Sequence, residues 1–320
     1  MEIEQELANI TPQGETLLTI GVFDGVHAGH RYLLGKLQQR AAEKNLISAV
    51  LTFNTRPQSV LHPHNQMPWL IDVEDRIKFL KELGINIAAV LTFTPKVAQL
   101  SAQEFMSLVK TQLRMRGIMV GHDFALGRGR RGNINLLRSL GSEMEFSVEI
   151  IPPYTINGEV VSSTLIRRAL AQGDMRKVER LMGRYFHLGG KVIASDKRGR
   201  VLGFPTANLD IKPQQALPDR GTYATITQVD GRQFPSATNI GIRPTFGEGE
   251  KMVETHLLHY KGDLYSKEIR VEFVQKLRDE QRFPSSEELK AQIEKDVREA
   301  EIVLARLPKN LFGGQAEELK

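Results

Sequence analysis

The sequence predicts an α/β protein of two domains: a parallel sheet with crossover helices on both faces, then a small antiparallel β-barrel with a C-terminal helix. Strand-like and helix-like runs alternate up to about residue 183, which is typical of parallel strands joined by helices. Beyond that point short strands follow one another with frequent turns, which favours a barrel. A chain of 320 residues is long enough to form two hydrophobic cores.

The first domain, residues 1–183, is expected to hold five strands and four main helices. The expected strands are 16–23, 48–53, 87–93, 117–121 and 146–152, and the expected helices are 31–44, 73–83, 101–113 and 133–140. Ser101 and Glu104 have the spacing of a capping box, which marks a helix start. Ligands of such sheets bind beyond the carboxyl ends of the strands, so the loops there are the first candidates for a site.

A glycine-rich turn, Gly21–His30, joins the first strand to the first helix. Such a turn directs backbone N–H groups and the positive end of a helix at its ligand, which favours phosphate. His27 and His30 are three residues apart, so both imidazoles can donate hydrogen bonds to one phosphate. The alternative is that they merely cap the helix. The other residues expected to bind a phosphate-bearing cofactor in this turn are Gly21, Phe23, Asp24 and Gly25.

A second loop, 121–132, also follows a strand and is expected at the same edge of the sheet. It carries Asp123 and the basic run Arg128-Gly129-Arg130-Arg131-Gly132. Such a charge run is either a solvated surface or a ligand-binding segment whose glycines let the backbone approach closely.

A third loop leads into a short helix at 161–170. Ser162 or Ser163 can cap this helix and still leave N–H groups for a phosphate. Thr164 is in the same first turn, and Arg167 lies one turn further, where a guanidinium can bind two phosphate oxygens. Alone the segment predicts a simple cap; with the glycine turn it predicts the second half of a triphosphate site.

The second domain, residues 184–320, is expected to begin between Gly183 and Gly190, where Gly189-Gly190 and the loss of helical periodicity indicate a boundary. Asp230-Gly231 predicts a two-residue hairpin. The expected strands are 191–194, 222–229, 233–240, 254–260 and 268–274, and a helix is expected to begin near Ser285.

The segment Lys197–Leu209 gathers the densest set of candidate residues in the barrel. Thr206 and Asn208 point the same way if the segment is extended, and their neutral oxygens suit Mg²⁺ whose other ligands are phosphates and water. Taken alone, the segment is better explained as a polar edge strand. Glu254 begins a strand and can act as a general base on a substrate hydroxyl, although an isolated glutamate is usually a surface charge.

The composition excludes several classes of protein. The chain has no cysteine, so disulfides and thiol chemistry are excluded. No window is apolar enough for a membrane span and the polar start lacks the features of a secretory signal, so a cytoplasmic location is expected. The formal net charge of +5 suits anionic ligands.

Taken together, these segments resemble the bacterial bifunctional riboflavin kinase/FAD synthetase family. The match spans roughly residues 15 to 300, and the motifs occur in the family's order. The segments similar to family motifs are Gly21–His30 (GxFDGxHxGH), Ser162–Arg167 (SSTxIR), Lys197–Leu209 (GR-x-LGFPTAN), Asn239–Phe246 and Glu254–Leu258.

The resemblance implies a Rossmann-like nucleotidyltransferase followed by a six-stranded barrel kinase. It implies that riboflavin and ATP give FMN, and that FMN and a second ATP give FAD and pyrophosphate. In the first domain it implies that His27 and His30 stabilise charge on the α-phosphate of ATP. Ser163, Thr164 and Arg167 are then expected to hold the departing phosphates, and Asp123 to lie near nucleotide and flavin.

In the kinase, the resemblance implies that Thr206 and Asn208 bind Mg²⁺ and that Glu254 accepts the proton of the riboflavin 5′-hydroxyl. Arg278 is expected to line the flavin site, and Arg200 and Gly203 to bind ATP in the glycine loop. Small molecules are therefore the expected partners, with no nucleic acid and no membrane, and the oligomeric state is left open.

The sequence departs from the family pattern in two places. Ala194-Ser195-Asp196 stands where a glycine is often found, and Asn54-Thr55-Arg56 lacks the acid and histidine common between Phe53 and Pro57.

Two alternatives also follow from the sequence. One is an adenylyltransferase for another phosphorylated vitamin with a barrel that only binds. The other is an RNA-binding barrel, which the low aromatic content of 7% disfavours.

Overall fold

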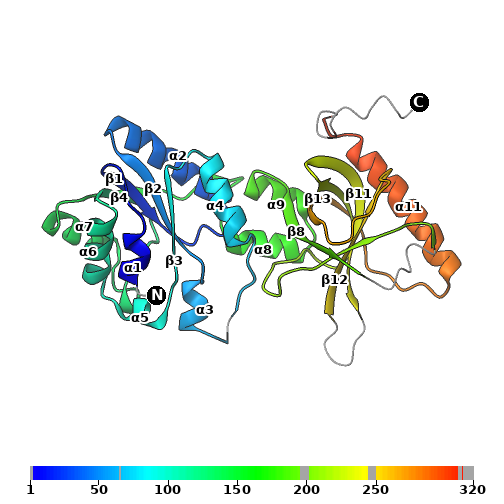
Figure 1. Ribbon diagram of the computed structural model, residues 1–320, viewed down its shortest axis with the longest axis horizontal. Coiled ribbons are helices and arrows are strands. Elements are labelled where there is room, and N and C mark those ends of the chain that lie inside the picture. The colour runs from blue at the N-terminus through cyan, green and yellow to red at the C-terminus, as the bar shows by residue number, and fades with distance from the viewer. Residues whose placement is uncertain (1–2, 65, 195–201, 244–249, 309–311, 313–320) are drawn as a thin grey trace. The chain divides into compact units, whose positions relative to one another are not determined.

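The computed structural model describes residues 3–64, 66–194, 202–243, 250–308 and 312. It divides into two compact units, Met1–Ser163 and Thr164–Lys320, and each is described by itself (Figure 1). The division of the sequence between residues 183 and 184 remains a proposal. No helix in the described part of the chain is both long and apolar enough to cross a membrane.

The first unit is built on a five-stranded parallel sheet, as predicted. Its strand order is β3-β2-β1-β4-β5, and each neighbouring pair is parallel. The strands are β1 (Thr16–Ile20), β2 (Ile47–Phe53), β3 (Ile87–Leu91), β4 (Met115–Gly121) and β5 (Ser147–Ile151).

Helices cover both faces of this sheet because alternate strand residues are apolar on both sides. On one face Leu17 and Val50 pack with Leu34 and Leu37 of α2 (Ala28–Glu43). The same cluster includes α4 (Val73–Glu82). On the other face the strands pack with α1 (Ile3–Ala8), α6 (Ala102–Gln112) and α7 (Ile134–Glu143). Short elements complete the unit: α3 (Pro57–Leu61), α5 (Pro95–Gln99), η1 (Arg128–Arg130), β6 (Thr155–Ile156) and β7 (Glu159–Val160).

The strand order places the chain reversal between β1 and β4. The chain runs outward from β1 to β2 and β3 and then returns to β4 on the other side of β1. Loops at the carboxyl ends of two such strands diverge to opposite faces and leave space for a ligand. The glycine turn after β1 and the Asp123 loop after β4 therefore begin next to each other at one edge of the sheet.

The second unit is a closed six-stranded antiparallel barrel in the order β10-β11-β12-β9-β8-β13, which confirms the predicted fold class. Two helices, α8 (Ser163–Ala171) and α9 (Met175–Met182), precede the barrel in the chain, and α11 (Ser286–Leu304) follows it (Figure 1). The strands are β8 (Phe186–Ile193), β9 (Ala207–Leu209), β10 (Gly221–Val229), β11 (Arg232–Arg243), β12 (Glu250–Leu257) and β13 (Glu268–Asp279).

Gly189-Gly190, the boundary signal expected from the sequence, lies inside β8, the first strand of the barrel in chain order. A Cβ at Gly190 would lie 2.5 Å from the carbonyl oxygen of Asp210, so only glycine allows the chain leaving β9 to approach β8 this closely. The hairpin prediction is confirmed: Asp230 and Gly231 both have positive φ and join the paired residues Val229 and Arg232.

The inside of the barrel contains a closed ring of five hydroxyl groups, all on residues that are fully buried. Its contacts run from Thr225 to Ser236 (2.8 Å), Thr227 (2.7 Å), Thr255 (3.3 Å), Thr238 (2.9 Å) and back to Thr225 (2.7 Å). Every member has two hydroxyl neighbours, so the burial of five polar groups is compensated. Apolar packing on the outer face, where Ala224 and Ile226 contact the α11 cluster, completes the core.

We expect Thr238→Val to lower the free energy of unfolding of the barrel by about 1 to 2 kcal/mol, because the new side chain has the same shape but leaves two buried hydroxyls short of a partner. Calorimetric unfolding of the full chain measures this change. Thr111→Val, on an exposed position of α6, is the matched control and should stay within about 0.5 kcal/mol of the parent. Equal effects of the two substitutions would show that the ring adds nothing to stability.

Candidate functional site

The glycine turn between β1 and α2 is held in a strained conformation. Gly25 has a φ of +86°, and a Cβ there would lie 2.9 Å from Leu70 Cδ1. Phe23 and Val26 also have positive φ values, 49° and 37°, although neither is glycine. Non-glycine residues adopt such backbone only where the surrounding structure imposes it, and they are concentrated at functional sites.

The two histidines of the turn lie face to face. Their ring centroids are 3.6 Å apart and the planes are inclined by 14°, so both imidazoles present their edges in the same direction. His27 is the N-cap of α2, and its Nδ1 accepts a hydrogen bond from the backbone N–H of His30 at 3.2 Å. Because Nδ1 accepts, the proton of neutral His27 lies on Nε2, which is a hydrogen-bond donor.

The helix behind the histidines is suited to an anion. The first turn of α2 carries no acidic side chain, so the positive end of its dipole is not neutralised locally. Gly29 is required beside the stacked rings, because a Cβ there would lie 3.2 Å from His27 Cε1 and 3.3 Å from the carbonyl oxygen of Val161. The capping contact of His27 uses Nδ1, and a phosphate role for this residue stays a prediction.

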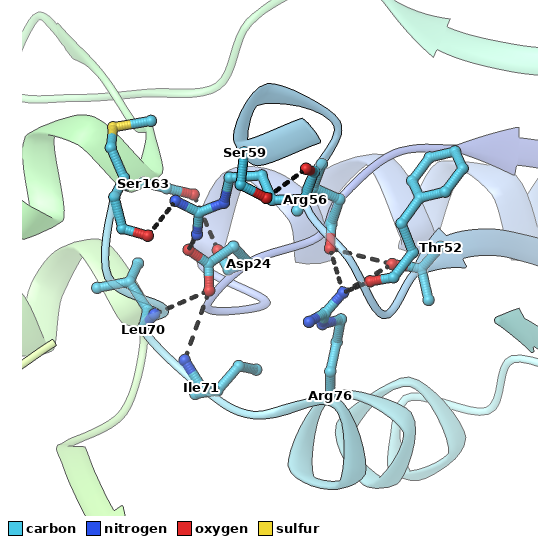
Figure 2. A network of polar contacts seen from close by, with 11 residues as sticks. Asp24, Thr52, Arg56, Ser59, Leu70, Ile71, Arg76 and Ser163 are labelled. Atoms are coloured by element: carbon cyan, nitrogen blue, oxygen red, sulfur yellow. Dashed lines mark hydrogen bonds and ion pairs between the residues drawn. The ribbon is translucent and has the colours of Figure 1, made fainter. Parts of the chain in front are cut away.

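Asp24 is 3% exposed, and its carboxylate is bound by other parts of the first unit (Figure 2). Oδ1 accepts hydrogen bonds from the backbone N–H groups of Leu70 and Ile71 at 2.9 and 3.4 Å, and Oδ2 forms an ion pair with Arg56 at 2.7 Å. The carbonyl oxygen of Asp24 accepts from Ser163 Oγ at 2.9 Å. These contacts give Asp24 the role of fixing the turn, and cofactor binding by Asp24 stays a prediction.

Arg56 fills the place where the sequence lacks the family's acid and histidine, and a residue with a structural role was not predicted there. Its guanidinium donates to the Met67 carbonyl at 2.9 Å in addition to the Asp24 ion pair. It also lies over the ring of Trp69, 4.3 Å from the centroid. The segment 67–71 is thus bound to the turn through one buried cation.

A second buried cation, Arg76, joins the ends of two strands. Its Nη1 donates to the carbonyl oxygens of Val22 and Phe53 at 2.9 and 2.7 Å and to Thr52 Oγ1 at 3.1 Å (Figure 2). Burial lowers the pKa of Arg76 to about 10, and the nearby Asp24 carboxylate partly offsets that effect. The guanidinium lies 4.6 Å from the centroid of Trp69, so this ring contacts both arginines.

The remaining predicted residues of the nucleotide site are Asp123, in the loop after β4, and Ser163, Thr164 and Arg167, in α8. Ser163 begins α8 and contacts the turn through Asp24, as described above. Thr164 is exposed in the first turn of α8, and Arg167 is half-buried one turn further. Asp123 is exposed in the loop after β4, where its carbonyl oxygen accepts from Arg130 Nη2 at 3.3 Å. The structure thus brings Ser163 to the glycine turn that holds both histidines.

In the barrel, strand register aligns three predicted site residues with two that sequence reasoning missed. Asn208 of β9 is opposite Glu254 of β12, which is opposite Asn239 of β11. Asn239 is opposite Thr222 of β10, which is opposite Arg278 of β13. Directly paired residues share one face of a sheet, so these five side chains form a continuous line on the barrel's outer face, here called the polar row.

Arg278 is fixed at one end of the polar row by α11. Its Nε and Nη2 donate to the buried carboxylate of Asp296 at 2.9 and 2.8 Å, and Gln292 donates to the same carboxylate at 2.8 Å. Phe283 lies beside the guanidinium, which is 5.6 Å from the ring centroid. An oriented cation beside a partly exposed aromatic ring is compatible with a planar polar ligand such as a flavin.

The other end of the polar row is compatible with Mg²⁺. The described residues contain no cluster of three or more histidines, cysteines or acids that could hold a metal, so any metal there needs neutral oxygens and ligand phosphates. Asn208 is 6% exposed, and its Nδ2 has no hydrogen-bond partner among the described residues. Thr206 is half-buried two residues earlier, and the exposed Gly203 has a φ of +91°. Arg200 lies outside the described residues.

We expect Asp24→Asn to lower the free energy of unfolding of the first unit by about 3 to 5 kcal/mol, because it leaves the buried Arg56 guanidinium without its counterion. Denaturant unfolding followed by circular dichroism measures the loss. Glu149→Gln removes a carboxylate that pairs with Arg40 and Lys44 nearer the surface, and it should cost less than about 1 kcal/mol. Similar losses in both variants would contradict a special role for Asp24.

Comparison with known proteins gives matches over both parts of the chain. A family model described as FAD synthetase matches residues 9–165, and one described as riboflavin kinase matches residues 182–304. A protein of Escherichia coli strain K12, named bifunctional riboflavin kinase/FMN adenylyltransferase, is 38% identical over 89% of this chain and 91% of its own. A protein of the same name from Pseudomonas fluorescens is 37% identical over 95% of this chain and 98% of its own.

A solved structure is similar over nearly the whole chain. It is titled macrolide-efflux protein from Streptococcus pneumoniae, and the similarity covers 94% of this chain and 97% of that one. The TM-score is 0.85 and the sequence identity is 26%. The likeness supports the assignment of the fold, and the activity named in that title belongs to that protein.

Proposed function

The chain belongs to the family of bifunctional riboflavin kinase/FMN adenylyltransferases, and on this premise we propose that it converts riboflavin to FMN and FMN to FAD. The first reaction transfers the γ-phosphoryl group of ATP to riboflavin and releases ADP. The second transfers AMP from another ATP to FMN and releases pyrophosphate. The observation that carries the proposal is the presence of two separate polar sites in one chain, the histidine turn and the polar row.

In the adenylyl transfer, a phosphate oxygen of FMN attacks the α-phosphorus of ATP while the bond to the β-phosphate oxygen breaks. Negative charge on the α-phosphate is stabilised by the edges of His27 and His30 and by the N-terminus of α2. Gly21, Phe23 and Gly25 lie in the same turn and are proposed to line the nucleotide site. The N–H of Gly21 itself donates to the Leu51 carbonyl at 3.0 Å, so its contribution is to the shape of the turn. Ser163, Thr164 and Arg167 hold the departing β- and γ-phosphates, and Asp123 lies near the nucleotide and flavin.

In the kinase reaction, Glu254 accepts the proton of the riboflavin 5′-hydroxyl as its oxygen attacks the γ-phosphorus. Glu254 is half-buried on β12, between Asn208 and Asn239 in the polar row. Arg278 and Phe283 bind the flavin ring at the far end of the row. Both reactions are phosphate displacements, in which positioning and charge stabilisation provide most of the catalysis.

Thr206 and Asn208 are the residues that we propose as the protein's ligands for Mg²⁺. When bound, Mg²⁺ neutralises phosphate charge, and its preference for neutral and phosphate oxygens fits the donors at this end of the row. Gly203 and Arg200 belong to the segment that we propose to contact ATP beside the metal. We further propose the cytoplasm as the location of both reactions, because each consumes ATP.

Incubation of the full chain with riboflavin and MgATP, followed by chromatography, tests the proposed function directly. FMN should appear first and FAD later, with ADP and pyrophosphate as the other products. A chain that formed FAD from supplied FMN but no FMN from riboflavin would be only an adenylyltransferase.

We expect His30→Ala to slow FAD formation from FMN by about 100-fold or more and to leave FMN formation unchanged, because it removes one charge-stabilising group of the first site. Glu254→Ala should do the reverse, since it removes the proposed base of the second site. Initial rates of each half reaction measure both effects. His259→Ala and Glu268→Ala, on exposed positions of the second unit, are the controls and should leave both rates unaltered. A step that kept its rate after its own substitution would refute that residue's role.

A further inference from the structure

Thr222 lies in the polar row but belongs to none of the motifs described above. Strand register places it between Asn239 on one side and Arg278 on the other. Thr222 is therefore on the face that carries Glu254, two strands away from it. The alternate residues Tyr223 and Thr225 are fully buried and form part of the barrel interior.

The hydroxyl group of Thr222 is buried and has no partner in the part of the chain that the structure describes. The residue is 5% exposed, and Oγ1 has no hydrogen bond among the described residues. Thr225 and Thr227 of the same strand differ, because both belong to the closed ring inside the barrel. A buried, unpaired hydroxyl lowers the stability of the fold, so a group outside the folded chain is the natural partner for it.

A second unpaired polar atom lies in the same row. Asn208 Nδ2 is also buried and has no hydrogen-bond partner in the described part of the chain. The two unpaired atoms belong to residues on opposite sides of Glu254 along the row. One ligand extended along the row can reach both sides of the proposed base.

The spacing of the strands identifies which part of riboflavin faces Thr222. Paired residues on antiparallel strands are about 5 Å apart, so Thr222 is about 10 Å along the row from Glu254 and Arg278 is about 15 Å from it. The ribityl chain from the 5′-oxygen to the ring nitrogen has six bonds, about 7 Å at the roughly 1.2 Å per bond of an extended chain. With the 5′-hydroxyl about 3 Å from the Glu254 carboxylate, the ring nitrogen lies about 10 Å along the row. The secondary hydroxyls therefore pass Asn239 and end beside Thr222, and the ring extends from there toward Arg278.

We propose that Thr222 is a specificity-determining residue of the kinase site, whose hydroxyl forms a hydrogen bond with a secondary hydroxyl of the ribityl chain. The proposal rests on the proposed function, since it takes Glu254 as the residue that receives the 5′-hydroxyl. The contact forms away from water, where a lost hydrogen bond weakens binding more than at the surface. It selects flavins that carry the polyol over flavins that lack it.

Thr222→Val tests the proposal, because valine keeps the shape and removes the hydroxyl. We expect the KM for riboflavin in the kinase reaction and the Kd for riboflavin in equilibrium dialysis to rise about tenfold, with kcat and the KM for ATP unchanged. Affinity for lumiflavin, which has a methyl group in place of the ribityl chain, should stay at the wild-type value. Thr222→Ser retains the hydroxyl and should restore the riboflavin constants.

The same variant should unfold at a higher temperature than the wild type, by about 2 to 4 °C, because it removes an unsatisfied buried polar atom. Thr19→Val is the matched control. Thr19 Oγ1 is likewise buried and has no partner within the described ranges, but it lies in β1 of the first unit. This control should gain stability and keep the riboflavin constants of the wild type.

Three results would overturn the proposal. Unchanged riboflavin affinity in Thr222→Val would show that the hydroxyl is not used by the substrate, as when a buried water satisfies it. An equal loss of lumiflavin affinity would place the contact on the ring and not on the polyol. A wild-type chain that forms no FMN would refute the proposed function itself. The proposal for Thr222 would then fail with it, because it depends on that function.

Discussion

The first unit depends on a buried carboxylate that no ligand is needed to satisfy. Asp24 binds two backbone N–H groups, one guanidinium and, through its carbonyl, the hydroxyl of Ser163. These partners come from three separate stretches of the chain, so the turn cannot change shape without breaking several buried contacts at once. These contacts offset the cost of the positive φ values at Phe23 and Val26, and they hold the stacked histidines in one orientation without a ligand.

In the second unit the governing constraint is the alternation of side chains in a closed barrel. Inward positions of β10, β11 and β12 hold the hydroxyl ring, and outward positions of the same strands hold the polar row. The two sets have opposite properties. The inward hydroxyls satisfy one another and stabilise the barrel. Two outward residues, Asn208 and Thr222, have polar atoms with no hydrogen-bond partner among the residues that the structure describes. The inward face of each strand therefore stabilises the barrel, and its outward face carries the proposed kinase site.

Much of the fold followed from local sequence patterns. The alternation of strands and helices, the capping box at Ser101 and the Asp230-Gly231 hairpin are short-range signals, and the structure bears each of them out. The contacts of Asp24 could not be predicted from the sequence, because the partners of its side chain are 32 to 47 residues away in the chain. The polar row could not be predicted either, because it depends on the pairing register of five strands. That register includes an irregularity between Thr222 and Tyr223. The place of Gly190 inside β8 was not predictable either, because the close approach of the Asp210 carbonyl depends on the pairing of distant segments.

The chain has a single tryptophan, Trp69, and it lies against both buried arginines. Its indole emission therefore reports on the environment beside the glycine turn and contains no direct signal from the barrel. An unfolding or titration experiment read by intrinsic fluorescence follows one half of this two-part enzyme, while the tyrosines and the far-ultraviolet signal report on both. The natural sequence thus carries a built-in optical label for separating the two halves, without any engineered probe.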